Sequence, residues 1–237
     1  MGNYETKNLD VVYFVREGQN EELRYSLRSV EKNLPHHKVW IIGGKPADIK
    51  PDEFVRVIQN GMRSKWDNVR ANLRRVGMNE DITEDFILMN DDFFINKPIT
   101  EIPPYFRSTL YEHIVRIEMK YNDTPTEYTR SLRRTCRALE AIGAPTLSYE
   151  LHVPIILNRH KLLETIGAFP DERATRTLYG NYHRIGGTQM ADVKVIPNTV
   201  AFDPEAIFLS TDDSTFGDTP VGKHIKSQFP QKSRFEL

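Results

Sequence analysis

The chain has 237 residues, with 32 Lys and Arg against 33 Asp and Glu. Its formal net charge of −1 gives no general argument for binding nucleic acid or membranes, and the single cysteine, Cys136, excludes an internal disulfide framework. No apolar run is long enough to span a bilayer and residues 1–10 are unlike a secretory signal, so the expected location is the cytoplasm.

The first ninety residues alternate short apolar runs with stretches of helical spacing. Apolar runs of four to eight residues predict buried strands, and apolar side chains three and four residues apart predict helices. In chain order, the pattern predicts a strand over 9–15, a helix over 21–34, strands over 39–42 and 54–58, a helix over 66–76 and a strand over 86–89. Strands and helices that alternate at such short intervals predict an α/β fold, with a mostly parallel central sheet flanked by helices.

The pattern weakens after residue 98. We expect one domain over 1–237, with a helical or irregular insertion near 98–150. The later predictions are an arginine-rich helix over 126–142, a strand over 150–157, a helix over 159–166, strands over 192–196 and 206–210, and an irregular tail from residue 220.

The apolar run at 86–89 leads directly into Asn90, Asp91 and Asp92. Ligands of open α/β sheets bind beyond the carboxyl ends of the strands, and Mg²⁺ prefers one or two carboxylates together with substrate phosphates. The motif therefore predicts a metal–diphosphate site. The alternative is a simple turn, in which Asp91 caps the backbone and Asp92 is solvated.

A second carboxylate pair, Asp212-Asp213, follows the late strand over 206–210. If both pairs face one crevice, the second supplies another metal ligand or a general base. The alternative is a helix N-cap before Ser214.

His152 lies in the predicted strand over 150–157. A histidine in an apolar strand is more often a satisfied core residue than a catalyst, but Pro154 favours a strand end near a cleft. The following segment, from Arg173 to Arg184, has little apolar periodicity, so it is either a surface loop or a lid that presents guanidinium groups to phosphates.

Several enzyme classes lack their signatures in this chain. We find no phosphate-binding P-loop, no dinucleotide fingerprint, no zinc-ligand spacing and no nucleophile elbow. Basic faces at 63–75 and 130–137 are typical of solvated helix surfaces, but they leave nucleic acid open as an acceptor that we do not favour.

Four blocks of the chain, in order, resemble the Stealth family of sugar-phosphate transferases. The strongest is the second block, which contains Glu-Leu-Arg-Tyr-Ser-Leu-Arg-Ser-Val-Glu and continues to Asn-Asp-Asp-Phe-Phe. The blocks are the opening strand at 9–13, the run 20–33 continuing through 68–76 and 86–94, the stretch from His152 through Phe169-Pro170 to Arg184, and 208–213. Together they touch most of the chain between residues 9 and 213.

The resemblance implies a nucleotide-diphosphosugar transferase fold of the GT-A type, with Mg²⁺ or Mn²⁺ as cofactor. It implies metal binding by Asp91 and Asp92, and catalytic roles for Asp92, His152, Arg184, Asp212 and Asp213. Arg184 is the better match than Arg176, because it follows a histidine. The candidate substrate-binding residues in the same blocks are Arg24, Arg28, Asn68, Asn90, Arg173, Arg176 and His183.

Two features depart from the family pattern. Residues 14–18 read Phe-Val-Arg-Glu-Gly where members usually show Trp-Val-Asp-Gly, so Glu17 stands as a substitute for that acid. The chain is also short and lacks the flanking modules of capsule polymerases.

These observations predict a metal-dependent enzyme that uses a nucleotide-sugar donor, which the resemblance implies to be a UDP-sugar. It would move sugar-1-phosphate to a hydroxyl of a polysaccharide or another acceptor. One alternative is an ordinary glycosyltransferase that moves the sugar alone, to a saccharide or a modified DNA base. The other is a non-catalytic module that binds nucleotide sugars or carbohydrate.

Overall fold

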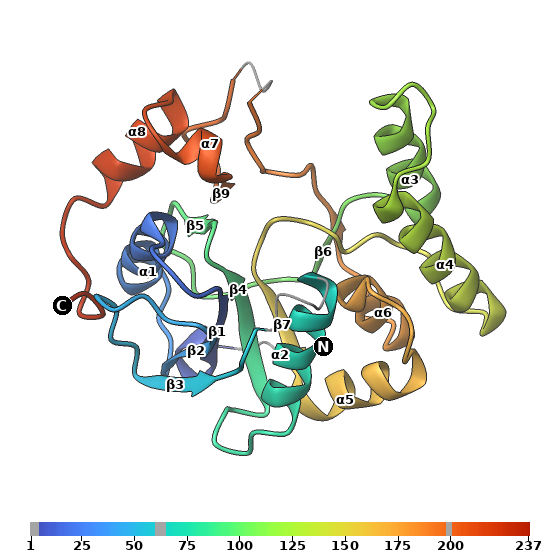
Figure 1. Cartoon of the computed structure of the whole chain (residues 1–237), viewed down its shortest axis with the longest axis horizontal. Coiled ribbons are helices and arrows are strands. Elements are labelled where there is room, and N and C mark those ends of the chain that lie inside the picture. Colours follow the sequence, from blue (N-terminus) through green and yellow to red (C-terminus); the bar gives the residue numbers. More distant parts are fainter. Residues whose placement is uncertain (1–4, 60–64, 198–200) are drawn as a thin grey trace. The chain divides into compact units, whose positions relative to one another are not determined.

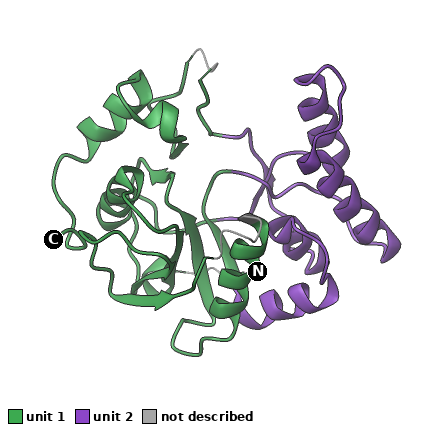
Figure 2. Ribbon diagram, in the orientation of Figure 1, with its two compact units in different colours: residues 1–102, 152–157, 193–237 green, residues 103–151, 158–192 purple. Residues whose placement is uncertain are grey.

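The structure is a computed structural model that describes residues 5–59, 65–197 and 201–237. The chain divides into two compact units, shown in two colours in Figure 2. Unit 1 contains residues 1–102, 152–157 and 193–237, and unit 2 contains residues 103–151 and 158–192. The insertion predicted near 98–150 overlaps the first part of unit 2, which also takes in 158–192.

A five-stranded sheet with the strand order β3-β2-β1-β4-β7 forms the centre of unit 1 (Figure 1). The β1–β2, β1–β4 and β2–β3 pairs are parallel. The strands are β1 (Asp10–Val15), β2 (Val39–Gly43), β3 (Glu53–Arg56), β4 (Asp85–Asn90) and β7 (Ile155–Asn158). The prediction of an α/β fold with a mostly parallel central sheet flanked by helices is confirmed at this level.

The helices α1 (Glu21–Asn33) and α2 (Lys65–Gly77) lie in the crossovers that lead from β1 to β2 and from β3 to β4. A short 3₁₀ turn, η1 (Thr6–Asn8), precedes β1. Helix α1 forms because its apolar residues Leu23, Leu27 and Val30 share one buried face. Each helix was predicted from the helical spacing of its own apolar residues, and both predictions are confirmed.

The sheet has a topological switch point between β1 and β4. From β1 the chain moves by way of β2 to β3 on one side, and then returns to place β4 on the other side of β1. The crossover loops that leave β1 and β4 therefore diverge, which opens a crevice at the carboxyl ends of these two strands.

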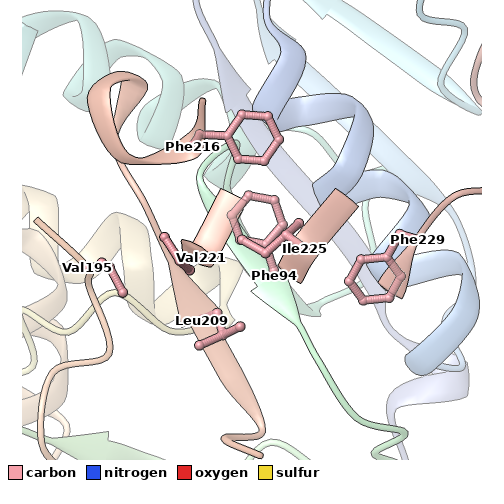
Figure 3. Packing of buried hydrophobic residues seen from close by; sticks show 7 residues of the cluster. All are labelled: Phe94, Val195, Leu209, Phe216, Val221, Ile225 and Phe229. Carbon is pink, nitrogen blue, oxygen red and sulfur yellow. The ribbon is translucent and has the colours of Figure 1, made fainter. Parts of the chain in front are cut away.

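The last part of unit 1 packs over a small separate hydrophobic cluster, shown in Figure 3. Strand β5 (Phe93–Ile95) pairs antiparallel with β9 (Phe208–Ser210), which leads into α7 (Asp213–Phe216) and α8 (Pro220–Gln228). The rings of Phe94 and Phe216 stack with centroids 5.7 Å apart. The cluster consists of Phe94, Val195, Leu209, Phe216, Val221, Ile225 and Phe229. The irregular tail predicted from residue 220 is wrong, because Val221 and Ile225 give α8 a buried apolar face.

Unit 2 is mostly helical and has a core of its own. Its helices are α3 (Leu110–Met119), α4 (Glu127–Ala141), α5 (Arg159–Ala168) and α6 (Thr175–Tyr182), and β6 (Tyr105–Phe106) pairs with β8 (Thr188–Gln189). The predictions of α4 and α5 are confirmed. Its buried cluster consists of Leu110, Ile114, Leu132, Leu139, Phe169, Ala174 and Leu178.

Two local predictions after residue 150 are wrong. The strand predicted over 150–157 begins only at Ile155, so His152 lies in a bend before β7. The segment predicted over 192–196 is not a strand and makes a single bridge, between Lys194 and Ser210. For the arginine segment, which the sequence left open between a surface loop and a lid, the structure shows that α6 forms within it and buries Thr177 and Leu178.

Candidate functional site

A pocket of about 530 Å³ lies at the switch point of unit 1, beyond the carboxyl ends of β1 and β4. The loop after β1, the first turn of α1, the turn after β4 and the start of α7 line it. The lining residues are Arg16, Glu17, Gln19, Asn20, Glu21, Glu22, Asp91, Asp92, Lys194, Asp212, Asp213, Phe216 and Gly217. Both predicted carboxylate pairs therefore face one pocket.

Asn20 links α1 to the first carboxylate pair. Its Oδ1 accepts a hydrogen bond from the Leu23 N–H at 2.9 Å and so caps α1, and its Nδ2 donates to Asp91 Oδ2 at 2.6 Å. Burial, and next the charge of Asp92, raise the pKa of Asp91 to about 6. The carboxyl group of Asp91 is thus held in place by Asn20, while its burial disfavours the ionised form.

Asp92 forms an ion pair with Lys194, whose Nζ lies 2.8 Å from Asp92 Oδ2. The other oxygen, Oδ1, is buried and accepts no hydrogen bond from the described part of the chain. The backbone around Asp92 is fixed, since its carbonyl accepts from the Thr211 N–H at 3.3 Å. A buried carboxylate oxygen without a donor is costly, and a cation at this position would satisfy it.

Glu22 enters the pocket from the first turn of α1. The residue is only 8% exposed, and the Thr211 hydroxyl donates to its Oε1 at 2.5 Å. Burial raises the pKa of Glu22 to about 7, and the negative charges of Asp92, Asp91 and Asp213 add to the shift although the Thr211 hydrogen bond opposes it. Glu22 is therefore able to take up or release a proton near neutral pH.

The second carboxylate pair divides into two roles. Asp212 is the N-cap of α7, as the simpler sequence interpretation proposed, and it accepts hydrogen bonds from the Ser214 and Thr215 N–H groups. Burial opposes ionisation of Asp212, but these hydrogen bonds outweigh it and hold the pKa below its usual range. Asp213 is exposed at the pocket and is available to a ligand.

The pocket is strongly acidic. Seven carboxylates line it against two cationic side chains, Arg16 and Lys194. Within the described ranges no three His, Cys, Asp or Glu residues are grouped as metal ligands. Two carboxylates are nevertheless enough for Mg²⁺ or Mn²⁺ where substrate phosphates and water complete the coordination. The Oδ1 atom of Asp92, which accepts no hydrogen bond from the described residues, fits as a ligand of such an ion.

Glu17, the predicted substitute for the missing family acid, also lies at the pocket. Its carboxylate is 3.2 Å from Arg56 on β3, and both side chains are largely exposed. An exposed ion pair of this kind contributes little to stability.

The substrate-binding candidates of unit 1 lie outside the pocket lining. Arg24 forms an ion pair with Asp48. Arg28 binds both carboxylate oxygens of Glu236, at 2.7 and 2.6 Å, and donates to a backbone carbonyl, so it fastens the C-terminal segment to α1. The remaining two, Asn68 in α2 and Asn90 at the end of β4, are half-buried.

His152 is half-buried and contacts the Phe93 ring edge-on, with ring centroids 6.0 Å apart. It does not line the pocket. Its proposed catalytic role stays a prediction.

The remaining candidates belong to unit 2. Arg173 pairs with Glu127 at 2.5 Å, and exposed Arg184 donates to the Gly143 carbonyl at 2.9 Å. Burial lowers the pKa of Arg176 to about 10. His183 caps α6, and burial lowers its pKa as well. None of these four is among the residues that line the pocket of unit 1.

The basic faces noted in the sequence are partly described. On α4, Arg130, Arg134 and Arg137 are exposed, whereas Arg133 pairs with Glu118. Arg63, at the start of the other face, lies outside the described residues.

Sequence reasoning assigned no role to Asn20, Glu22, Thr211 or Lys194, although all but Thr211 line the pocket. The first two stand in the strongest resemblance block, directly after the β1 loop, and this position is the signal that points to them. Lys194 has no local signal, because its contact with Asp92 spans 102 residues.

Neither the models of known protein families nor the sequences of curated proteins match this chain. Among solved structures, a crystal structure of the glycosyltransferase GlyE from Streptococcus pneumoniae TIGR4 is similar, with a TM-score of 0.33 and 8% identity over 53% of this chain and 42% of that chain. Its apo form gives a TM-score of 0.32 and 7% identity, over 60% and 44%. This chain thus matches under half of either structure, and similarities at this level carry no argument about function.

No helix in the described ranges is long and apolar enough to cross a bilayer.

Proposed function

We propose that this protein is a metal-dependent transferase that uses a nucleotide-sugar donor and moves sugar-1-phosphate to an acceptor hydroxyl. The observation that carries the proposal is the place of Asp91 and Asp92, in a pocket of about 530 Å³ at the switch point of a parallel sheet. Ligands of open α/β sheets bind at this point, and the pocket volume suits a small ligand. The sequence resemblance to sugar-phosphate transferases supports the same function.

Asp91 and Asp92 are the residues that would hold Mg²⁺ or Mn²⁺. When bound, the ion neutralises the negative charge of a diphosphate, which seven carboxylates would otherwise repel. Asn20 keeps the Asp91 carboxylate in place through its hydrogen bond of 2.6 Å. Arg16, exposed at the rim of the pocket, is free to approach a phosphate oxygen.

The transfer needs a group that accepts the proton of the acceptor hydroxyl. Glu22 suits this role, because it lines the pocket and its pKa is about 7. Exposed Asp213 is the second choice. The acceptor oxygen bonds to the β-phosphorus, the bond from that phosphorus to the bridging oxygen breaks, and nucleoside monophosphate leaves with the bridging oxygen.

The same residues also suit an ordinary glycosyltransferase, in which the hydroxyl attacks the anomeric carbon and nucleoside diphosphate leaves. If the acceptor is a modified DNA base, the exposed arginines on α4 predict salt-dependent DNA binding.

The test is incubation with a panel of nucleotide sugars, Mn²⁺ or Mg²⁺ and candidate acceptors, with identification of the released nucleotide. Release of monophosphate is the expected result. Asp92→Ala should abolish it, whereas Asp81→Ala, in the exposed turn before β4, should keep it. Release of diphosphate would replace the proposal by ordinary glycosyl transfer, and donor binding without any release would leave a binding module.

A further inference from the structure

The backbone of Lys194 is fixed by hydrogen bonding to a neighbouring strand, and its ammonium group lines the pocket. Its backbone forms a bridge with Ser210 at the end of β9, and the next N–H, of Val195, donates to the Ser210 carbonyl at 2.8 Å. The Val195 side chain is part of the cluster in Figure 3. The backbone of Lys194 is therefore fixed, and its flexible four-carbon side chain is the part that can move.

The ammonium of Lys194 is the counter-ion of Asp92 in this conformation. The ion pair of 2.8 Å is partly buried, with 21% of the Lys194 side chain and 17% of the Asp92 side chain exposed. The other two acidic groups at the centre of the pocket have neutral partners, since Asp91 accepts from Asn20 and Glu22 accepts from Thr211. Of these three carboxylates, Asp92 is thus the one that has a cationic partner in the described part of the chain.

A divalent cation on Asp92 would meet this ammonium at close range. Two cations a few ångströms apart repel each other strongly where water is partly excluded, so one carboxylate does not serve both equally well. The repulsion falls if the ammonium swings to a nearby anion, and a phosphate of a bound diphosphate supplies one.

We propose that Lys194 is a positioning residue that competes with a divalent cation for Asp92 and, once displaced, binds a phosphate of the incoming ligand. The protein would thereby bind metal weakly by itself and tightly together with a diphosphate. This inference rests on the cation of the proposed function, but not on which bond of the donor breaks.

The test is calorimetric titration of Mn²⁺ into the purified protein without any donor, with Lys194→Met as the variant. Competition predicts that Lys194→Met binds Mn²⁺ at least about tenfold more tightly than the wild type, because the competing charge is gone. Lys226→Met is the matched control, because Lys226 pairs with pocket residue Glu21 at 3.2 Å and not with Asp92. It removes the same charge nearby and should change the affinity by less than about threefold.

A second titration, of pyrophosphate in the presence of saturating Mn²⁺, tests the other half of the proposal. Lys194→Met should bind pyrophosphate at least about tenfold more weakly than the wild type, and Lys194→Arg should retain most of the affinity. Circular dichroism and thermal unfolding check that the variants fold.

The proposal is overturned if Lys194→Met leaves the Mn²⁺ affinity unchanged or weaker, if Lys226→Met tightens binding equally, or if neither wild type nor Lys194→Met binds Mn²⁺. Because these titrations contain no donor, failure of the nucleotide-release assay alone would refute the proposed chemistry and leave this inference standing.

Discussion

Replacing Glu22 by Gln is expected to stabilise the protein above neutral pH. Glu22 is 8% exposed and its pKa rises from 4.5 to about 7 on folding. The folded protein therefore keeps a proton that the unfolded chain releases, so folding becomes less favourable as the pH rises from about 4.5 to about 7 and remains so above it. Gln has the same shape, carries no charge and still accepts the Thr211 hydrogen bond.

The size of the effect follows from the pKa shift. A shift from 4.5 to about 7 corresponds to at most about 3.4 kcal/mol, and solvent screening at the open pocket is expected to reduce this to about 1–2 kcal/mol. The free energy of unfolding of Glu22→Gln minus that of wild type should thus be about 1–2 kcal/mol larger at pH 8 than at pH 5.

The assay is urea unfolding at both pH values in a buffer with chelator, so that no cation screens the carboxylates. Because only the difference between the two proteins is compared, the other titrating groups cancel to first order. Glu21→Gln, on the same helical turn with 54% of its side chain exposed, should alter stability by the same small amount at both pH values. If Glu22→Gln differs from the wild type in free energy of unfolding by the same amount at pH 5 and at pH 8, burial and the neighbouring acids do not destabilise ionised Glu22, and the reasoning is refuted.

Two further predictions concern stability. Arg28→Met should lower the free energy of unfolding by about 2–4 kcal/mol in urea denaturation, because Glu236, whose side chain is 4% exposed, would lose its bidentate partner; a change below about 0.5 kcal/mol would contradict this role. Gly180→Ala in α6 should lower the melting temperature, since a Cβ there would overlap the buried ring of Tyr149. Gly167→Ala in α5 is its control, because a Cβ there meets nothing within 4 Å and should stabilise the helix; equal melting temperatures for the two variants would refute the overlap.

The local pattern of apolar residues was enough to predict the strands and helices in the first half of the chain. The strand over 9–15 was predictable because its continuous apolar run is typical of a strand that is buried on both faces. The helix over 21–34 was predictable because its apolar side chains share one buried face. The carboxylate pairs at 91–92 and 212–213 were recognisable for a related reason, since charge that directly follows an apolar strand needs a partner.

Tertiary contacts explain why helix α6 could not be predicted from the sequence. Asn181 in α6 is buried because its amide donates to the Leu147 carbonyl at 2.7 Å and its Oδ1 accepts from the Leu147 N–H. The Thr177 hydroxyl likewise donates to Glu150. Polar side chains that are buried against distant partners hide the apolar periodicity of a helix, so the segment resembles a loop when it is examined by itself.

The candidate site divides in the same way. The sequence by itself determined that acidic groups stand at the carboxyl ends of two strands, because the order of residues along the chain fixes where each strand ends. Only the tertiary structure decided that both pairs share one pocket, that Asp212 caps a helix, and that Glu22 and Lys194 join Asp91 and Asp92 there. The physical reason is that burial, ion pairing and pKa depend on which charges lie within a few ångströms, and these charges come from residues as far apart as 22 and 213.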